Sequence, residues 1–255
     1  MPELSDLDVA CVRADNAGPY TLSGTNTWVL GRDPAWVIDP GPALPDHVEA
    51  VAAEVEARGG AGGIAITHDH DDHVEGVPAL RERLGGPTVA ASRYPADVTL
   101  SDGDSFGPLQ AIAIPGHAPD HLAFVAGAAC FTGDAVLGEG SVFVQEALAG
   151  YLAALERLRE LPLTVICPGH GPPVWAPREK LDQYIAHRLE RERRLIAALE
   201  DGLYECDELL DAVWDDAPAA LRPAAAITLA AHLQKLREEG RLPPPTDAEP
   251  EPAPR

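Results

Sequence analysis

The sequence has no closely spaced cysteine pair, few basic residues and no long apolar run. Its four cysteines, Cys11, Cys130, Cys167 and Cys206, form no CxxC pair, which argues against a zinc knuckle and against a disulfide framework. The N-terminus has no basic and apolar leader, and no stretch approaches the roughly 20 apolar residues of a membrane span. We therefore expect a cytoplasmic protein with reduced thiols and no membrane partner.

Positive charge is scarce. The 255 residues include 19 Lys and Arg against 41 Asp and Glu, which gives a formal net charge of -22. Such a charge repels polyanions at long range, so nucleic acid is not the default partner. Metal ions bound in a cleft would reverse the sign locally. The charge therefore biases the choice of substrate without deciding it.

The sequence does contain strand-like and helical segments that alternate over its first two thirds. Strands are predicted at 27–30, 35–38, 64–66, 88–91, 109–114, 122–125, 130–132 and 163–167. Helices are predicted at 46–58 with Asp46 as N-cap, at 74–84, at 147–160 and at 177–199 with Leu181, Ile185, Leu189 and Ile196 on one side. Interleaved strands and helices indicate a layered α/β architecture.

A smaller unit is predicted after Gly202, where the pattern of the long helix breaks. Three short helical pieces at 206–214, 218–220 and 224–239 have the outline of a winged-helix-like appendage. We place a catalytic domain at 1–200, the appendage at 201–242, and a Pro- and Glu-rich tail, expected to be disordered, at 243–255.

A polar run, HDHDDH at 68–73, follows the predicted strand 64–66. It places three imidazoles and a carboxylate within one turn-sized stretch, where unpaired ionisable groups are costly unless they are solvated or bound to a metal. A solvated surface loop is the alternative for this run taken alone. Asp69 and Asp71 alternate with the other members and should face away from them.

Three later segments share one sequence pattern, in which an apolar strand and a glycine-containing turn precede a residue that is a strong metal ligand. The ligands are His117, Asp134 and His170, and the glycine lets the backbone turn so that each side chain reaches the same rim. Each has a simple explanation by itself, as a helix cap, a turn residue or a surface histidine. Four such segments in this order are hard to obtain by chance.

The motif order HxHxDH, PGH, GD and PGHG, over roughly residues 20–200, resembles the metallo-β-lactamase superfamily. The resemblance implies a four-layer αββα sandwich that holds two zinc ions, although manganese or iron would also suit these donors. It assigns the first ion to His68, His70 and His117, the second to Asp72, His73 and His170, and both to Asp134. The implied reaction is hydrolysis by a hydroxide that bridges the ions.

Other segments, among them GTNT at 24–27, GHAPDH at 116–121 and AHLQKL at 231–236, resemble the β-lactamase-like protein 2 group. That group joins the catalytic domain to a C-terminal winged-helix-like domain, and its best-known activity is endonucleolytic cleavage of single-stranded RNA. We therefore rank RNA phosphodiesters first as substrate. A small-molecule ester, thioester or lactam comes second, because fold and metal pair are shared among these activities.

Two further residues could support the ligands. His121 lies outside the seven expected ligands, and we count it with Asp72 and Asp134 as a catalytic residue that orients a neighbour or contacts substrate. A buried, hydrogen-bonded histidine is the alternative. Asp39 ends the predicted strand 35–38 and could accept a hydrogen bond from a metal-bound imidazole, although a turn role explains it as well.

A function of another class is a winged-helix nucleic-acid-binding module with a vestigial enzyme domain. Four arginines between positions 188 and 194 form a basic patch, but they alternate with Glu190 and Glu192, which favours ion pairs within the helix. Residues 221–236 are rich in Ala and Leu and carry few basic groups. We expect the appendage to pack on the catalytic domain, narrow the cleft or form a homodimer.

Overall fold

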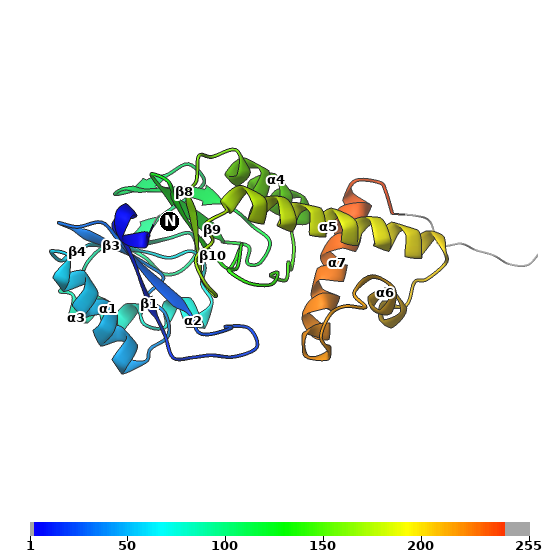
Figure 1. The fold of residues 1–255 in the computed structure, drawn as a ribbon. Coiled ribbons are helices and arrows are strands. Elements are labelled where there is room, and N and C mark those ends of the chain that lie inside the picture. Colours follow the sequence, from blue (N-terminus) through cyan, green and yellow to red (C-terminus); the bar gives the residue numbers. More distant parts are fainter. Residues whose placement is uncertain (1–2, 243–255) are drawn as a thin grey trace, which may run out of the picture. The chain divides into compact units, whose positions relative to one another are not determined.

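The structure is a computed structural model that describes residues 3–242, and the chain divides between Ile185 and Ala186 into two compact units (Figure 1). The first unit contains two β-sheets with helices outside them, and the second is helical. Among the described helices, none combines the length and apolar character needed to cross a membrane.

The first sheet has the strand order β1-β2-β3-β4-β5-β6. Its strands are β1 (Val9–Arg13), β2 (Asn26–Leu30), β3 (Ala35–Ile38), β4 (Ala61–Ala65), β5 (Val89–Ala91) and β6 (Val98–Thr99). Strands β1 to β3 are antiparallel neighbours, whereas β3 to β6 are parallel. Because parallel neighbours need a crossover, helices follow β3 and β4.

The second sheet has the order β11-β10-β9-β8-β7. Its strands are β7 (Ser105–Phe106), β8 (Leu109–Ala113), β9 (Leu122–Ala126), β10 (Ala129–Gly133) and β11 (Val165–Pro168). Trp28 and Ile38 of the first sheet pack with Phe124 and Phe131 of the second in one apolar cluster, so the core of this unit lies between the sheets.

Helices cover the outer faces of the sheets. They are α1 (Pro45–Ala57), α2 (Asp71–Val74), α3 (Val77–Arg83), α4 (Leu148–Arg159) and the start of α5 (Pro177–Glu200). Val51 and Val55 of α1 and Leu80 of α3 pack against Val37 and Ile64 of the first sheet, and α1 and α3 lie together beside this sheet in Figure 1. This is the predicted four-layer αββα sandwich, with short 3-10 turns such as η1 (Leu4–Leu7) at its margin.

Two details of the helix predictions are wrong. Asp46 does not cap α1, because the helix begins at Pro45 with Leu44 at the N-cap position. Proline suits the first turn of a helix, where a backbone N–H would have no partner within the helix. The helix predicted at 74–84 is divided at Gly76, whose N–H donates to the Gly41 carbonyl at 2.8 Å. A Cβ at position 76 would lie 2.9 Å from that same oxygen.

The second unit contains the end of α5, α6 (Cys206–Val213), η2 (Ala219–Leu221) and α7 (Arg222–Glu238). Its core includes Leu195, Leu210, Val213, Leu229 and Leu236, and its elements match the predicted helical pieces. The domain boundary at residue 200 stays a prediction, and the predicted tail at 243–255 lies outside the described residues.

Charged side chains occupy buried positions of α5 where apolar ones were expected. Leu189, predicted on the packed side, is 50% exposed, whereas Arg191 and Glu192 are buried. Arg191 donates to the Val213 carbonyl at the end of α6 and pairs with Asp216. The prediction that Leu189 lies on the buried face was therefore wrong. That face of α5 includes Arg191, whose guanidinium donates to a free carbonyl at the end of a neighbouring helix.

The expected ion pairs within α5 are only partly correct. Arg193 does pair with Glu190 one turn away, at 2.6 Å. Arg194, like Arg191, instead reaches the end of α6, where it bonds to the Ala212 carbonyl and to Asp215. Arg191 and Arg194 therefore connect α5 to the end of α6 and do not form an open basic patch.

Candidate metal centre

The first unit brings together all seven predicted ligands, each on a segment that follows a strand. His68 and His70 lie between β4 and α2, Asp72 and His73 lie in α2 itself, and His117, Asp134 and His170 follow β8, β10 and β11. Three combinations of donor atoms lie close enough to hold a metal ion. They are His68 with His70 and His117, His68 with His73 and Asp134, and Asp72 with His73 and His170.

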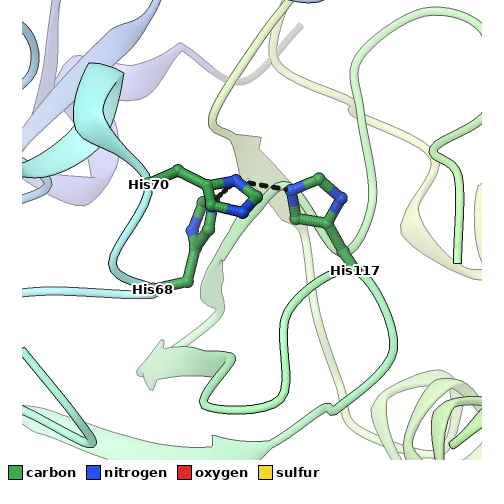
Figure 2. A group of neighbouring side chains, drawn as sticks. All are labelled: His68, His70 and His117. Carbon is green, nitrogen blue, oxygen red and sulfur yellow. Dashed lines mark hydrogen bonds between the residues drawn. The ribbon is translucent and has the colours of Figure 1, made fainter. Parts of the chain in front are cut away.

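Three histidines form what we term the first group: His68, His70 and His117. Figure 2 shows their rings pointing toward one another. His70 Nδ1 lies 3.1 Å from His68 Nε2 and 3.0 Å from His117 Nε2. His70 Nδ1 carries at most one proton, so it cannot donate to both neighbours. Three lone pairs that converge on a cation would satisfy all of these atoms.

Asp72, His73 and His170 form the second group. Asp72 Oδ2 lies 3.5 Å from His73 Nε2 and 3.3 Å from His170 Nε2. Both histidines are buried, whereas the Asp72 side chain is 29% exposed. This group therefore opens to solvent at its carboxylate.

Asp134 lies between the two groups. Its Oδ1 is 3.5 Å from His73 Nε2 and 3.3 Å from His170 Nε2, both in the second group. Its Oδ2 is 3.6 Å from His117 Nε2 in the first group. The carboxylate thus directs one oxygen toward each group, as a shared ligand would.

The spacing of these atoms fits metal ions. Donors around a tetrahedral ion bound at about 2.0–2.1 Å lie about 3.3–3.4 Å apart, and the separations here are 3.0–3.6 Å. His73 Nε2 and Asp134 Oδ1 are buried without a hydrogen-bond partner, although buried polar atoms normally have one. Bound cations would satisfy both atoms.

Asp39, at the end of β3, orients one histidine of each group. Its Oδ2 lies 2.9 Å from His73 Nδ1 and accepts the Thr67 hydroxyl proton at 2.7 Å. Thr67 Oγ1 is also 2.9 Å from His68 Nδ1. Because the only hydroxyl proton of Thr67 goes to Asp39, His68 Nδ1–H must be the donor in that contact. His68 and His73 therefore both present Nε2 to the site, and the predicted contact of Asp39 with a candidate ligand is present.

His121 packs beneath the site. Its ring stacks on His68 with 4.6 Å between centroids, and its Nε2 accepts the Asp134 backbone N–H at 3.2 Å. The side chain is only 1% exposed. Because so little of its surface is available to a substrate, the geometry fits the predicted orienting role and also the alternative of a buried, hydrogen-bonded histidine, but not substrate contact.

The pKa values of His170 in the second group and His117 in the first group shift in opposite directions. Burial opposes the charged form of His170, but contacts with Asp134 and Asp72 outweigh it and raise the pKa of His170 to about 9. Burial lowers the pKa of His117 to about 4. Burial also opposes ionisation of Asp72, but His170 and His73 lower the pKa of this carboxyl to about 2. Without ions, protons on the second group balance its carboxylates, and metal binding there must displace them.

Several residues next to the site were not singled out from the sequence. Thr25 and Asn16 reach Asp72 through hydrogen bonds; GTNT at 24–27 was the only sequence signal for Thr25, and Asn16 had none. The ring centroids of Phe143 and His117 are 4.9 Å apart. The ring centroids of Tyr20 and Phe143 are 6.3 Å apart, and Tyr20 is 55% exposed. We call Tyr20 and Phe143 the aromatic edge.

Comparison with known proteins identifies the family and the fold. Residues 86–170 match the metallo-beta-lactamase superfamily, and residues 206–242 match the beta-lactamase associated winged helix domain. A metallo-beta-lactamase family protein from Thermus thermophilus has a similar fold, with a TM-score of 0.72 at 23% identity over 91% of this chain and 94% of that one.

Two curated relatives are similar over most of their length. The beta-lactamase-like protein 2 homolog of Caenorhabditis elegans is 33% identical over 257 residues, which cover 93% of this chain and 86% of the relative. The atrochrysone carboxyl ACP thioesterase of Aspergillus chevalieri is 34% identical over 220 residues, which cover 79% of this chain and 70% of the relative.

The chain therefore belongs to the metallo-β-lactamase superfamily, in the form that carries a C-terminal winged helix. Within that superfamily it is similar to the β-lactamase-like protein 2 homologs, as the sequence motifs predicted.

Proposed function

We propose that the protein is a hydrolase with two metal ions, one held by the first group, one by the second, and both by Asp134. The orientation of Asp134 carries the proposal, because its two oxygens face different groups at separations typical of donors that share ions. Zinc suits this mixture of imidazole and carboxylate, and manganese or iron would also fit.

The chain's own residues prepare the site. Asp39 and Thr67 fix the tautomers of His73 and His68, and His121 fixes the backbone at Asp134. The donors are thus oriented before any ion binds, which is the usual role of groups behind metal ligands. Bound ions would supply water activated at neutral pH and a positive field for the developing oxyanion.

For the substrate we propose a small-molecule acyl thioester or ester, the alternative that the sequence ranked second. The aromatic edge next to His117 offers apolar surface to an acyl group, because aromatic side chains combine large contact area with defined geometry. The net charge of -22 disfavours long polyanions. A relative of similar identity is named a thioesterase.

Single-stranded RNA, which the sequence motifs ranked first, is the second candidate. The second unit offers little support as an RNA-binding surface. Residues 186–242 contain twelve acidic and eight basic side chains, and Arg191, Arg194 and Arg222 are paired with aspartates inside this unit. RNA binding depends on free cationic groups that contact phosphates.

Metal content and substrate turnover, measured on the same preparation, test the proposal. We expect two ions per chain by elemental analysis, turnover of an acyl thioester and an acyl ester, and little cleavage of labelled single-stranded RNA or of nitrocefin. RNA cleavage that depends on the same metal would reverse the ranking of substrates. A folded protein that takes up no metal from supplied zinc would exclude the hydrolase and leave the binding-module alternative.

A further inference from the structure

Thr25 contacts the second group from the segment between β1 and β2. Its side chain is fully buried, and its Oγ1 lies 2.9 Å from Asp72 Oδ2. This carboxylate oxygen is the one that faces His73 and His170. The hydroxyl therefore touches the atom that would bind the metal.

The direction of this hydrogen bond follows from Asn16. Asn16 Oδ1 accepts the Thr25 backbone N–H at 2.8 Å, which fixes the amide because a backbone N–H can only donate. Asn16 Nδ2 must then be the atom that donates to Thr25 Oγ1, at 2.9 Å. The hydroxyl oxygen is thus occupied as an acceptor, and its single proton is left for Asp72.

The neighbouring residue serves the same group. The Gly24 carbonyl lies 3.3 Å from His170 Nδ1, and since a carbonyl can only accept, Nδ1–H is the donor and Nε2 is the nitrogen that His170 directs to the site. Gly24 has φ +123, and a Cβ there would clash with the Ala14 carbonyl. Consecutive residues of one segment therefore orient Asp72 and His170, whereas His68 of the first group is oriented from Thr67.

We propose that Thr25 and Asn16 are positioning residues for the second metal ion. They set the Asp72 carboxylate in its metal-facing orientation, with Asn16 directing the Thr25 proton and Thr25 holding the carboxylate. The inference rests on the proposed two-metal function. Loss of such supporting contacts typically weakens metal binding about 10–100-fold. We expect that loss at the second ion, with the first ion retained.

Stepwise titration of the metal-free protein with zinc, against a chelating indicator, tests this inference through affinity and not through activity. Thr25→Val removes the hydroxyl at nearly constant volume, and Thr25→Ser retains it as the matched control. Asn16→Leu keeps the Thr25 hydroxyl but removes the amide that directs the hydroxyl proton toward Asp72. We expect wild type and Thr25→Ser to bind two ions, Thr25→Val to lose the second about 10–100-fold, and Asn16→Leu to show a smaller loss of the same kind.

Melting curves of the metal-free variants separate positioning from folding. If Thr25→Val melts like wild type and still binds both ions with unchanged affinity, the inference is overturned. Equal weakening of both ions would overturn it as well, because it would indicate general damage. If Thr25→Val does not fold, the Asn16→Leu variant, which changes a partly exposed position, tests the inference by the same criteria. A wild-type protein that binds fewer than two ions would refute the proposed function itself, whatever the variants do.

Discussion

Each unit of the molecule buries charged groups, but the two units treat them differently. In the second unit, Glu192 pairs with Lys235 and with Arg241, each at 2.7 Å. In the first unit, His73 Nε2 and Asp134 Oδ1 are equally buried and have no hydrogen-bond partner. Glu192, Lys235 and Arg241 neutralise one another, whereas in the first unit the donor atoms of several residues converge on one point, where bound cations would satisfy them. Lack of a partner alone does not make this difference, since both ring nitrogens of His232 in the second unit also have no hydrogen-bond partner. Burial by itself therefore does not identify a functional site.

The largest test of this contrast is Asp134→Asn, which keeps the shape of the side chain and removes its charge. We expect loss of metal binding and a fall in hydrolysis well beyond the 10–100-fold typical of supporting residues, because both groups lose their shared ligand. The melting temperature of the metal-free protein should stay close to that of wild type, since the carboxylate serves ions more than the fold. A large loss of stability with metal content unchanged would contradict the contrast.

Glu192→Gln is the corresponding change in the second unit. Removal of one partner from a buried ion pair typically costs 3–5 kcal/mol. We expect about 2–3 kcal/mol here, because Glu239 still lies 2.9 Å from Lys235. Chemical denaturation would measure this loss, and metal content should not change. The double variant Glu192→Leu with Lys235→Met is the control, and it should be more stable than Glu192→Gln because no buried charge is left unpaired.

His232 gives the second unit a dependence on pH. Burial, and then the charges of Arg188, Lys235, His187 and Arg191, lower its pKa from 6.5 to about 3. The unfolded chain therefore binds a proton that the folded unit rejects, and the stability contributed by the neutral ring is complete above pH 6.5 and decreases as the pH falls toward 3. Denaturation at several pH values should show this slope in wild type and a shallower one in His232→Leu. Identical slopes would refute the assignment.

Tyr20→Ala should have the smallest effect. An aromatic contact contributes about 0.5–1.5 kcal/mol, so we expect KM for an aromatic or long-chain acyl ester to rise about 2–10-fold with kcat little changed. An acetyl ester is the control, because it is too short to gain from the aromatic edge. A similar rise for both esters would mean that Tyr20 supports the site generally and does not select the acyl group.

The sequence predicted which side chains lie together at the candidate site, because each position depends on local features. His117, Asp134 and His170 follow an apolar strand and a glycine turn, and both features can be read from a few neighbouring residues. Asp39, which directly follows a predicted strand, was also identified as a partner behind a ligand, but Thr25 and Asn16 could not be predicted in this way. Thr25 and Asp72 are 47 positions apart, and the direction of their hydrogen bond depends on the amide of a third residue, Asn16.

Helix faces were predicted where burial was apolar and missed where it was charged. Val51 and Val55 of α1 pack on the first sheet as their spacing indicated. Leu189 of α5 was assigned to the buried side, because the sequence does not show that Arg191 ends among the carbonyls of another helix. Strand β1 was also missed, as were β6 and β7, which have only two residues each and no pattern that repeats.

Hydrogen bonds from the segment that positions Asp72 also tie together regions that are distant along the chain. Asn26 Nδ2 donates to the carbonyls of Pro168 and Gly171, 142 and 145 residues away, and Trp28 Nε1 donates to Pro168 as well. During synthesis from the N-terminus, Asp72 and His73 emerge from the ribosome long before His170. A second ion could therefore not bind the proposed set of ligands until the two sheets had docked, and its capture would mark the end of folding and not its beginning.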